Sequence, residues 1–183
     1  MVQVADEIVT KAQQGDLKAF EEIYRTLFGF VSNVAFRIVG RREDAEEVTQ
    51  DVFMKIYHYL KDFRFQSSLK TWVYRITVNC ALNYVKKEAN KKRNVPYVDE
   101  VSSQPQEPSL ANREYQEKLV NELLSTLNPE QRAVIVLRSM EGLSYEEIAQ
   151  TLQIPINTVR SRIKRAREAM LALKKEVIQS ELQ

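Results

Sequence analysis

Residues 143–167, LSYEEIAQTLQIPINTVRSRIKRAR, decide the fold, because they predict two short helices joined by a tight turn. Ser144 can cap the first helix, and Glu147 three residues later can complete a capping box. Pro155 suits a turn or the first turn of the next helix, where its missing N–H is harmless. The second helix carries one apolar stripe, formed by Val159, Ile163, Ala166 and Met170. This arrangement is typical of a DNA-binding helix-turn-helix.

The other face of the second predicted helix is polar and basic. Between Ile156 and Lys175 the chain has seven Lys or Arg residues and one acid, Glu168, a local net charge of about +6. A solvated basic face on an ordinary surface helix is the alternative, but the capped preceding helix favours DNA binding. Gln153 occupies a turn position that glycine often fills. The candidate DNA contacts are Asn157, Thr158, Arg160, Ser161, Arg162, Lys164, Arg165 and Arg167.

Composition limits the class of protein. The 183 residues are 44% hydrophobic and 28% charged, which suits one domain or two small packed ones. No apolar run approaches the ~18–20 residues of a membrane span, so we expect no membrane insertion. Asp6 and Glu7 stand where a signal peptide would be cationic, and Cys80 is the single cysteine. These features predict a cytoplasmic protein without a disulfide framework.

Enzymatic chemistry is not expected. His58 is the only histidine, and it lies between two tyrosines in a helical stretch, where a packing role is the common one. The four glycines form no phosphate-binding loop, and no metal-ligand spacing occurs. Paired acids such as Glu46 and Glu47 are ordinary charges of a helix surface. We therefore predict neither catalysis nor a cofactor nor a metal.

Helical periodicity predicts an all-α fold of two small helical domains joined by a flexible linker. The linker, residues 94–113, contains three prolines with serine and glutamine and little apolar periodicity. Asn128, Pro129 and Gln131 form a second helix-start signal in the C-terminal domain. The predicted helices cover residues 3–14, 16–39, 42–62 and 68–92 before the linker, and 113–126, 129–140, 144–152 and 156–178 after it.

The predicted helix over 42–62 begins with a cluster of acids. Five acids fall in its first turns, where negative charge is favourable at a helix N-terminus. An exposed acidic face on a chain with a basic DNA-binding end also suits docking onto another protein. Both interpretations stay open at this point.

Residues 63–79, FRFQSSLKTWVYRITVN, mix aromatic side chains with hydroxyls and cations. Flat rings can stack on unpaired bases while cations meet the phosphates, so this composition suits a single-stranded nucleic acid. For Trp72, burial in a helical core is an equally weighted alternative. Further along, Asn83 and Lys86 open a basic stretch.

Four segments together resemble the extracytoplasmic-function group of bacterial sigma factors in the sigma-70 family, of the envelope-stress type. GDLKAF (15–20) resembles the start of region two, and DAEEVTQDVF (44–53) resembles its polymerase-binding helix. TWVYRITVN (71–79) resembles the promoter-melting segment, and residues 143–170 resemble region four. The resemblance implies region two over 1–93, the linker over 94–113 and region four over 114–183.

The resemblance also implies partners and site residues. Core RNA polymerase would meet Glu47, Gln50 and Asp51 through the clamp helices of its largest subunit. In the −35 element, Arg160, Ser161, Lys164 and Arg165 would face bases, while Arg162 and Arg167 would face phosphates. The non-template strand of the −10 element would meet Phe65, Ser67, Ser68, Lys70, Trp72, Tyr74, Arg75, Asn79, Asn83 and Lys86. An anti-sigma factor, often membrane-anchored, would hold such a protein inactive.

Two other functions remain open from the sequence. A conventional helix-turn-helix regulator would bind duplex DNA specifically without polymerase, usually at a palindrome. A pure interaction protein, such as a helical adaptor or an anti-sigma factor, would show no base specificity.

Overall fold

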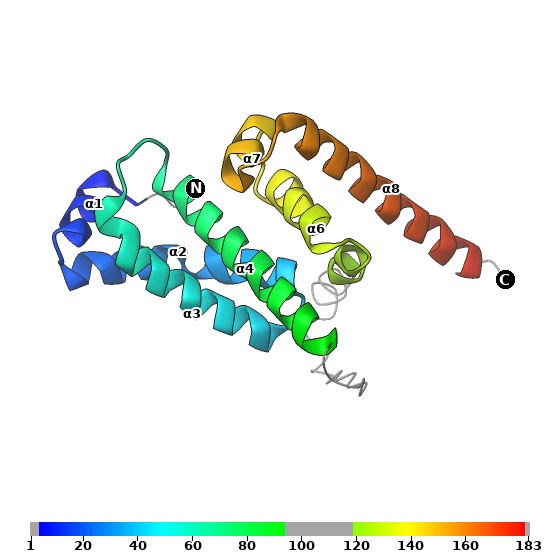
Figure 1. Cartoon of the computed structure of the whole chain (residues 1–183), viewed down its shortest axis with the longest axis horizontal. Coiled ribbons are helices and arrows are strands. Elements are labelled where there is room, and N and C mark those ends of the chain that lie inside the picture. Colours follow the sequence, from blue (N-terminus) through cyan, green and yellow to red (C-terminus); the bar gives the residue numbers. More distant parts are fainter. Residues whose placement is uncertain (1–3, 94–118, 182–183) are drawn as a thin grey trace.

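The computed structural model describes residues 4–93 and 119–181 of the chain, and every regular element in these two ranges is helical. The predicted linker over 94–113 lies outside the described residues. The helices form an N-terminal and a C-terminal group (Figure 1), so the all-α prediction is confirmed.

The N-terminal group packs three long helices around one core. It contains α1 (Asp6–Gln13), α2 (Leu17–Val39), α3 (Arg42–Tyr59), the short 3₁₀ turn η1 (Leu60–Asp62) and α4 (Leu69–Arg93). Asp16 caps α2, because its carboxylate accepts hydrogen bonds from the backbone N–H groups of Lys18 (2.8 Å) and Ala19 (3.2 Å). Gly40 ends α2 in the left-handed conformation (φ 88°). The buried side chains of α2 recur at Ile23, Leu27, Val31, Val34 and Ile38.

The C-terminal group contains the helix-turn-helix. A helix over 119–125 precedes α6 (Pro129–Ile135), the π-helical turn η2 (Val136–Met140), α7 (Tyr145–Leu152) and α8 (Ile156–Glu181). Both predicted capping boxes are present, one at Asn128 and Gln131 and one at Ser144 and Glu147. The hydrogen bonds from Ser144 lower the pKa of the Glu147 carboxyl.

Two predicted helices differ in detail from the structure. The stretch over 129–140 is α-helical only to Ile135 and then widens into η2, and the stretch over 42–62 ends as α-helix at Tyr59. The turn between α7 and α8 is made by Gln153, which adopts the left-handed conformation (φ 53°) that glycine usually supplies. The Gln153 N–H donates to the carbonyl of Ala149, so the turn geometry is that of a helix C-cap despite the missing glycine.

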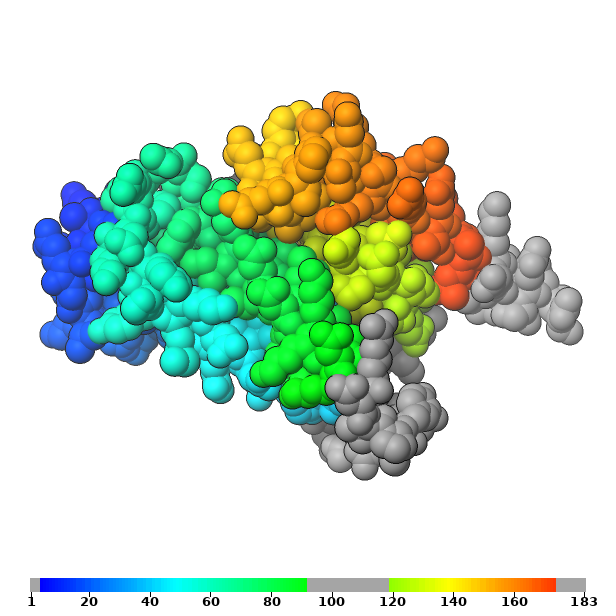
Figure 2. All heavy atoms as spheres, viewed as in Figure 1, coloured from blue at the N-terminus to red at the C-terminus, as the bar shows by residue number. Residues whose placement is uncertain are grey.

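The two groups pack against each other through α2 and α4 on one side and α6 and α7 on the other. In Figure 2 the C-terminal group lies on the α4 side of the N-terminal group, and α8 forms the outer edge. Buried apolar side chains continue from one group into the other without a break; they include Val73 and Val78 of α4, and Val134 and Leu137 of α6 and η2.

Candidate nucleic-acid and protein interfaces

The polar face of α8 is open to solvent. Val159, Ile163 and Ala166 are buried, as the apolar stripe predicted. Their burial turns the opposite face outward, where six of the predicted DNA contacts are exposed: Asn157, Arg160, Ser161, Lys164, Arg165 and Arg167. Thr158 is half-buried. Such a face presents hydrogen-bond donors along one side of a helix that is narrow enough to enter a major groove.

Arg162 lies differently from the other basic residues of α8. Its guanidinium donates to the carboxylate of Glu130 on α6 at 2.5 Å, and its side chain is 23% exposed. By contrast, the Lys164 side chain is 78% exposed, and its ammonium lies 3.9 Å from the carboxylate of Glu168 on the same helix. Arg162 therefore joins α8 to α6 in this conformation, while Lys164 faces solvent.

The loop between η1 and α4 presents an aromatic and several hydroxyls. Phe65 is 42% exposed and has φ 55°, a conformation that non-glycine residues rarely adopt. Its ring lies 4.9 Å from that of Phe63, which in turn lies 5.3 Å from Trp72. Ser68 begins α4 by accepting a hydrogen bond from the Thr71 N–H at 3.0 Å. Strained, exposed aromatics of this kind concentrate at functional sites.

A shallow pocket of about 340 Å³ opens beside this loop. Its wall includes Trp72, which is half-buried, so the ring is neither fully packed in the core nor free in solvent. The lining residues are Asp62, Phe63, Arg64, Gln66, Ser67, Trp72, Arg75 and, from the C-terminal group, Gln150.

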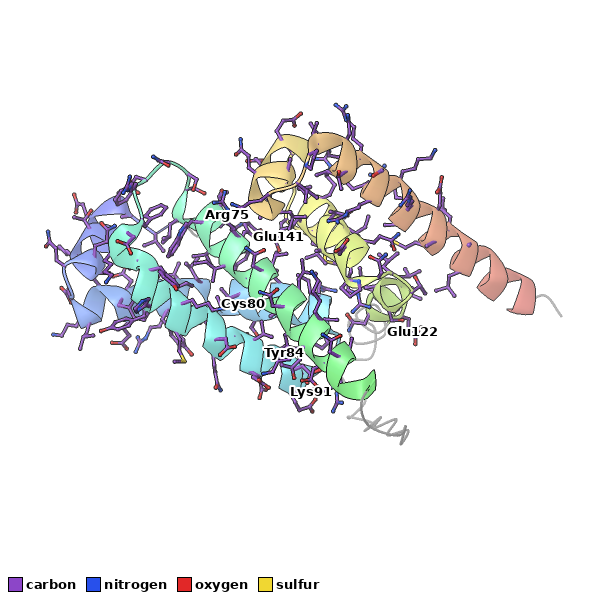
Figure 3. The ribbon with its side chains drawn as sticks, in the orientation of Figure 1. Arg75, Cys80, Tyr84, Lys91, Glu122 and Glu141 are labelled. Atoms are coloured by element: carbon purple, nitrogen blue, oxygen red, sulfur yellow. The ribbon has the colours of Figure 1, made fainter. Side chains whose placement is uncertain are left out.

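The remaining predicted single-strand contacts follow α4. Asn79, Asn83 and Lys86 are exposed along the helix. Tyr74 is 2% exposed, and its ring centroid lies 4.4 Å from that of Phe30 in an edge-to-face arrangement, so its face is not available to a base in this conformation. Arg75, in the first turns of α4, is half-buried (Figure 3).

The single cysteine lies on the inner side of α4. Cys80 is buried and accepts a hydrogen bond from the Lys55 ammonium of α3 at 3.2 Å. Burial raises the pKa of its thiol more than the nearby ammonium lowers it. The thiol is therefore a packed group.

The outer face of α3 carries the predicted protein-binding residues. Glu47, Gln50 and Asp51 are all exposed. At the start of the same helix, Asp44 accepts a hydrogen bond from the Tyr84 hydroxyl of α4 at 2.8 Å, which fixes α3 against α4.

The sequence alone did not reveal the aromatic groove next to this acidic face. Tyr24 and Phe28 of α2 are 40% and 43% exposed, and their rings lie 4.5 Å and 6.3 Å from Phe53 of α3. The groove measures about 330 Å³ and also includes Gln50. The sequence pattern that could have revealed the groove is the i, i+4 spacing of Tyr24 and Phe28, which lie on a face of α2 that points away from the core.

Two family models match the chain. Sigma-70 region 2 matches residues 23–91, and sigma-70 region 4 matches residues 117–170. The ECF RNA polymerase sigma-E factor of Haemophilus influenzae is 35% identical over 179 residues, covering 91% of this chain and 93% of that protein. The Escherichia coli sigma-E factor is also 35% identical, and the match covers 92% of this chain and 93% of that protein.

The chain belongs to the extracytoplasmic-function sigma factors of the sigma-70 family. The RNA polymerase sigma-H factor of Pseudomonas aeruginosa is 33% identical over 90% of each chain. Solved structures agree with this family. CnrH in complex with the cytosolic domain of CnrY gives a TM-score of 0.68 at 25% identity, covering 92% of this sigma factor and 96% of that chain. RpoE of Bartonella quintana in complex with the anti-sigma factor NepR gives a TM-score of 0.67 at 27% identity. The match covers 87% of this sigma factor and 98% of that chain.

Two further observations concern the described ranges of this sigma factor. Between residues 4 and 93 and between 119 and 181, no helix is both long and apolar enough to span a membrane. In the same ranges, His, Cys, Asp and Glu side chains form no group of three that could hold a metal ion.

Proposed function

We propose that this sigma factor directs core RNA polymerase to promoters by holding the −35 element with α8 and the −10 element with the loop and α4. One observation carries the proposal: the chain has two separate surfaces suited to DNA, and its acidic surface on α3 overlaps neither of them. A transcription factor that only bound an operator would need one DNA surface. The proposed units are region two over 1–93, a linker over 94–113 and region four over 114–183.

For the −35 element, the exposed face of α8 would enter the major groove. Arg160, Ser161, Lys164 and Arg165 would contact base edges, helped by Asn157 and Thr158, and Arg167 would contact phosphates. Arg162 is assigned to a phosphate as well, which requires it to leave Glu130 or to bridge Glu130 and the backbone of the DNA. Each good base contact would supply about 1–3 kcal/mol of discrimination.

For the −10 element, flipped bases of the non-template strand would enter the pocket beside the loop. Phe65 and Trp72 would stack on bases, and Ser67 and Ser68 would hydrogen-bond to them. Stacking of about 1–3 kcal/mol per base offsets the cost of unstacking. The remaining contacts along α4 would come from Lys70, Tyr74, Arg75, Asn79, Asn83 and Lys86.

For polymerase, the acidic face of α3 would meet basic clamp helices of the largest subunit through Glu47, Gln50 and Asp51. The exposure of all three and the lack of any role for them in the core support this assignment. An anti-sigma factor would be the regulatory partner, as in the RpoE and NepR complex. The protein would act in the cytoplasm and would carry out no catalytic step of its own.

Transcription in vitro tests this proposal. Core polymerase from Escherichia coli would be mixed with sheared bacterial genomic DNA, with and without this chain, and the 5′ ends of the transcripts would be sequenced. New start sites that share two upstream elements and appear only with the chain would support it. No new start sites, together with specific duplex binding by the chain alone, would favour the conventional helix-turn-helix regulator.

A further inference from the structure

The loop between η1 and α4, which we propose to contact the −10 element, leaves the helical core after Phe63. Residues 64–68 are all exposed, so burial contributes little to fixing their positions. Phe65 nevertheless has φ 55°, a conformation that persists only where the surrounding structure enforces it. The position of the loop must therefore be set at its two ends.

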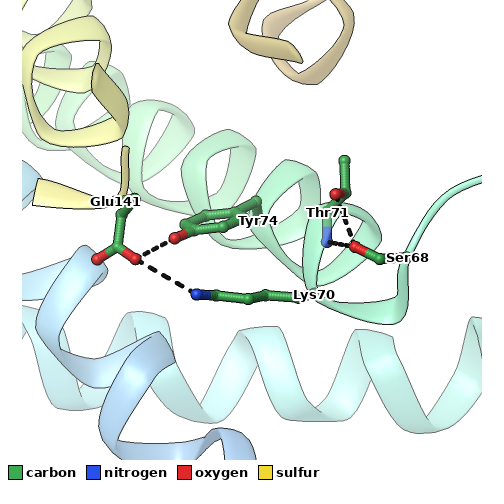
Figure 4. A network of polar contacts seen from close by, with 5 residues as sticks. All are labelled: Ser68, Lys70, Thr71, Tyr74 and Glu141. Atoms are coloured by element: carbon green, nitrogen blue, oxygen red, sulfur yellow. Dashed lines mark hydrogen bonds and ion pairs between the residues drawn. The ribbon is translucent and has the colours of Figure 1, made fainter. Parts of the chain in front are cut away.

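The α4 end of the loop is held by contacts of that helix. The Ser68 hydroxyl accepts a hydrogen bond from the Thr71 N–H at 3.0 Å and lies 2.8 Å from the Thr71 hydroxyl (Figure 4). Within the next turn, the Tyr74 hydroxyl donates to the Glu141 carboxylate, and the same carboxylate lies 3.8 Å from the Lys70 ammonium. The start of α4 is thus a fixed end for the loop.

The η1 end of the loop is held by one side chain of α1. The Gln13 amide nitrogen donates to the carbonyl of Leu60 at 2.9 Å and to the carbonyl of Phe63 at 2.7 Å. An amide nitrogen carries two hydrogens, so Gln13 can satisfy both carbonyls at once. The Leu60 carbonyl also accepts the Phe63 N–H at 3.0 Å. Gln13 therefore ties both ends of this turn to α1.

The two hydrogen bonds of Gln13 are shielded from water. Gln13 is half-buried, and Leu60 and Phe63 are 2% and 6% exposed. A buried carbonyl that loses its donor is left with an uncompensated cost of desolvation. Water is therefore a poor substitute for the Gln13 amide at this turn.

Phe63 connects this turn to the two rings that we propose to stack on bases. Its ring lies 4.9 Å from that of Phe65 and 5.3 Å from that of Trp72. Because stacking depends on the distance and angle between rings, a shift of Phe63 would weaken stacking at both. Gln13 is not among the residues that line the pocket beside the loop, so any effect on DNA must pass through Phe63.

We propose that Gln13 is a positioning residue for the −10 element, because it sets the place from which Phe65 and Trp72 meet the unpaired bases. The inference rests on the proposed function, since it concerns the same site. Gln13 precedes residues 23–91, which match sigma-70 region 2, so α1 supports the strand-binding surface from outside the matched segment. A binding group is useful only when the residues behind it hold it in place.

The free chain offers a direct readout, because Trp72 is its only tryptophan. Gln13→Met keeps the length of the side chain and removes both donors. Quenching of Trp72 fluorescence by acrylamide should rise about twofold, because the turn opens locally and Phe63 covers the ring less firmly. Gln14→Met, the same substitution at an exposed neighbour, is the matched control and should leave the quenching unchanged.

The holoenzyme tests the consequence for DNA. Core polymerase and each variant would be mixed with a promoter recovered by the start-site sequencing, and with templates that carry single base changes in its −10 element. Gln13→Met should slow melting, measured by permanganate reactivity, about tenfold. It should also flatten the base preference at the −10 element, which a mere loss of folded protein would leave intact. Gln13→Glu should have the larger effect, because its carboxylate would face two carbonyls. Duplex binding by α8 should not change.

The outcomes separate the inference from the proposed function. If Gln13→Met matches Gln14→Met in melting rate and base preference, the inference is wrong and the proposed function stands, since the wild type still initiates. Slower melting with an unchanged base preference would also overturn it, because the role of Gln13 would then be in stability alone. So would an altered base preference with unaltered Trp72 quenching. If the wild type itself opens no promoter, the proposed function fails.

Discussion

The helices α8 and α4 are the two that we propose to contact DNA, and they differ in what covers them. The polar face of α8 is exposed from Asn157 to Arg167, and its buried stripe holds it to α6 and α7. The first turns of α4 lie under the C-terminal group, with Tyr74 2% exposed. The polar face of α8 is thus accessible as a whole, whereas the strand-binding surface is mixed: Phe65 is 42% exposed and Tyr74 is buried.

The largest effect should come from a residue on neither DNA surface. Asp51→Lys reverses a charge on the acidic face of α3, and like charges brought together at an interface cost several kcal/mol. We expect core polymerase binding to weaken more than 100-fold, about 3 kcal/mol, while duplex binding by the free chain is unchanged. Co-purification with core polymerase measures the loss, and Glu22→Lys, on an exposed part of α2, is the control. Full recovery of polymerase with the Asp51 variant would show that α3 is not part of the polymerase interface.

The open surface should respond in the free chain. Arg165→Ala removes an exposed cation of α8 and should cost about 1–3 kcal/mol in −35 duplex binding, with a relaxed base preference. Electrophoretic mobility shifts on promoter duplexes and their base substitutions measure both effects. Arg25→Ala removes an equally charged, exposed residue from α2 and should leave binding unchanged. An unchanged base preference for the Arg165 variant would contradict the role of α8.

The loop before α4 should respond only with polymerase present. Phe65→Ala should slow promoter melting by the equivalent of about 1–3 kcal/mol, because one stacking platform is lost. Duplex binding by the free chain should stay the same. Permanganate reactivity of unpaired thymines measures the melting, and Tyr59→Ala, another exposed aromatic, is the control. Identical permanganate patterns in wild type and the Phe65 variant would exclude the loop from melting.

A substitution in the turn between α7 and α8 should change the stability of the fold without changing its charge. Gln153→Gly should raise the free energy of unfolding by about 0.5–1 kcal/mol, because glycine adopts φ 53° without steric strain. Urea unfolding followed by circular dichroism measures the gain. The same change at Gln14, where φ is −84°, should bring no gain. Equal effects at the two positions would mean that the left-handed conformation carries no strain here.

Arg162 tests whether every cation of α8 belongs to the open surface. Arg162→Ala breaks the partly exposed pair with Glu130 and should cost about 0–1 kcal/mol of stability. Its effect on duplex binding should be smaller than that of Arg165→Ala, although both remove one positive charge. Thermal unfolding and mobility shifts on the two variants make the comparison. A larger loss of DNA binding for Arg162→Ala would show that the pair opens on the DNA.

Local signals in the sequence were enough to predict the elements of the fold. The capping boxes at Asn128 and Ser144 are present, because a capping side chain and its partner lie only three residues apart. The apolar stripe of α8 is buried as its spacing predicted. The exposed residues of α3 and α8 follow from the same periodicity, since the faces opposite a buried stripe point outward.

Long-range contacts could not be predicted in the same way. Tyr74 and Glu141 are 67 residues apart, and nothing in either local pattern pairs them. The ion pair of Arg162 with Glu130 depends on how α6 crosses α8, so a basic residue expected to face DNA proved to be half-buried. The widening of the 129–140 helix at Val136 likewise depends on packing in the C-terminal group.

The π-helical turn η2 makes the contact between the two groups sensitive to chain length. A turn of this kind is an α-helix with one residue inserted. Deleting one residue from Val136–Met140 would restore α-helical geometry and rotate everything after it by about 100° relative to α6. Glu141 would then point away from Tyr74 and Lys70, although no residue of the contact itself had changed. Relatives that differ by a single insertion or deletion at this turn should therefore differ in how their C-terminal group contacts α4.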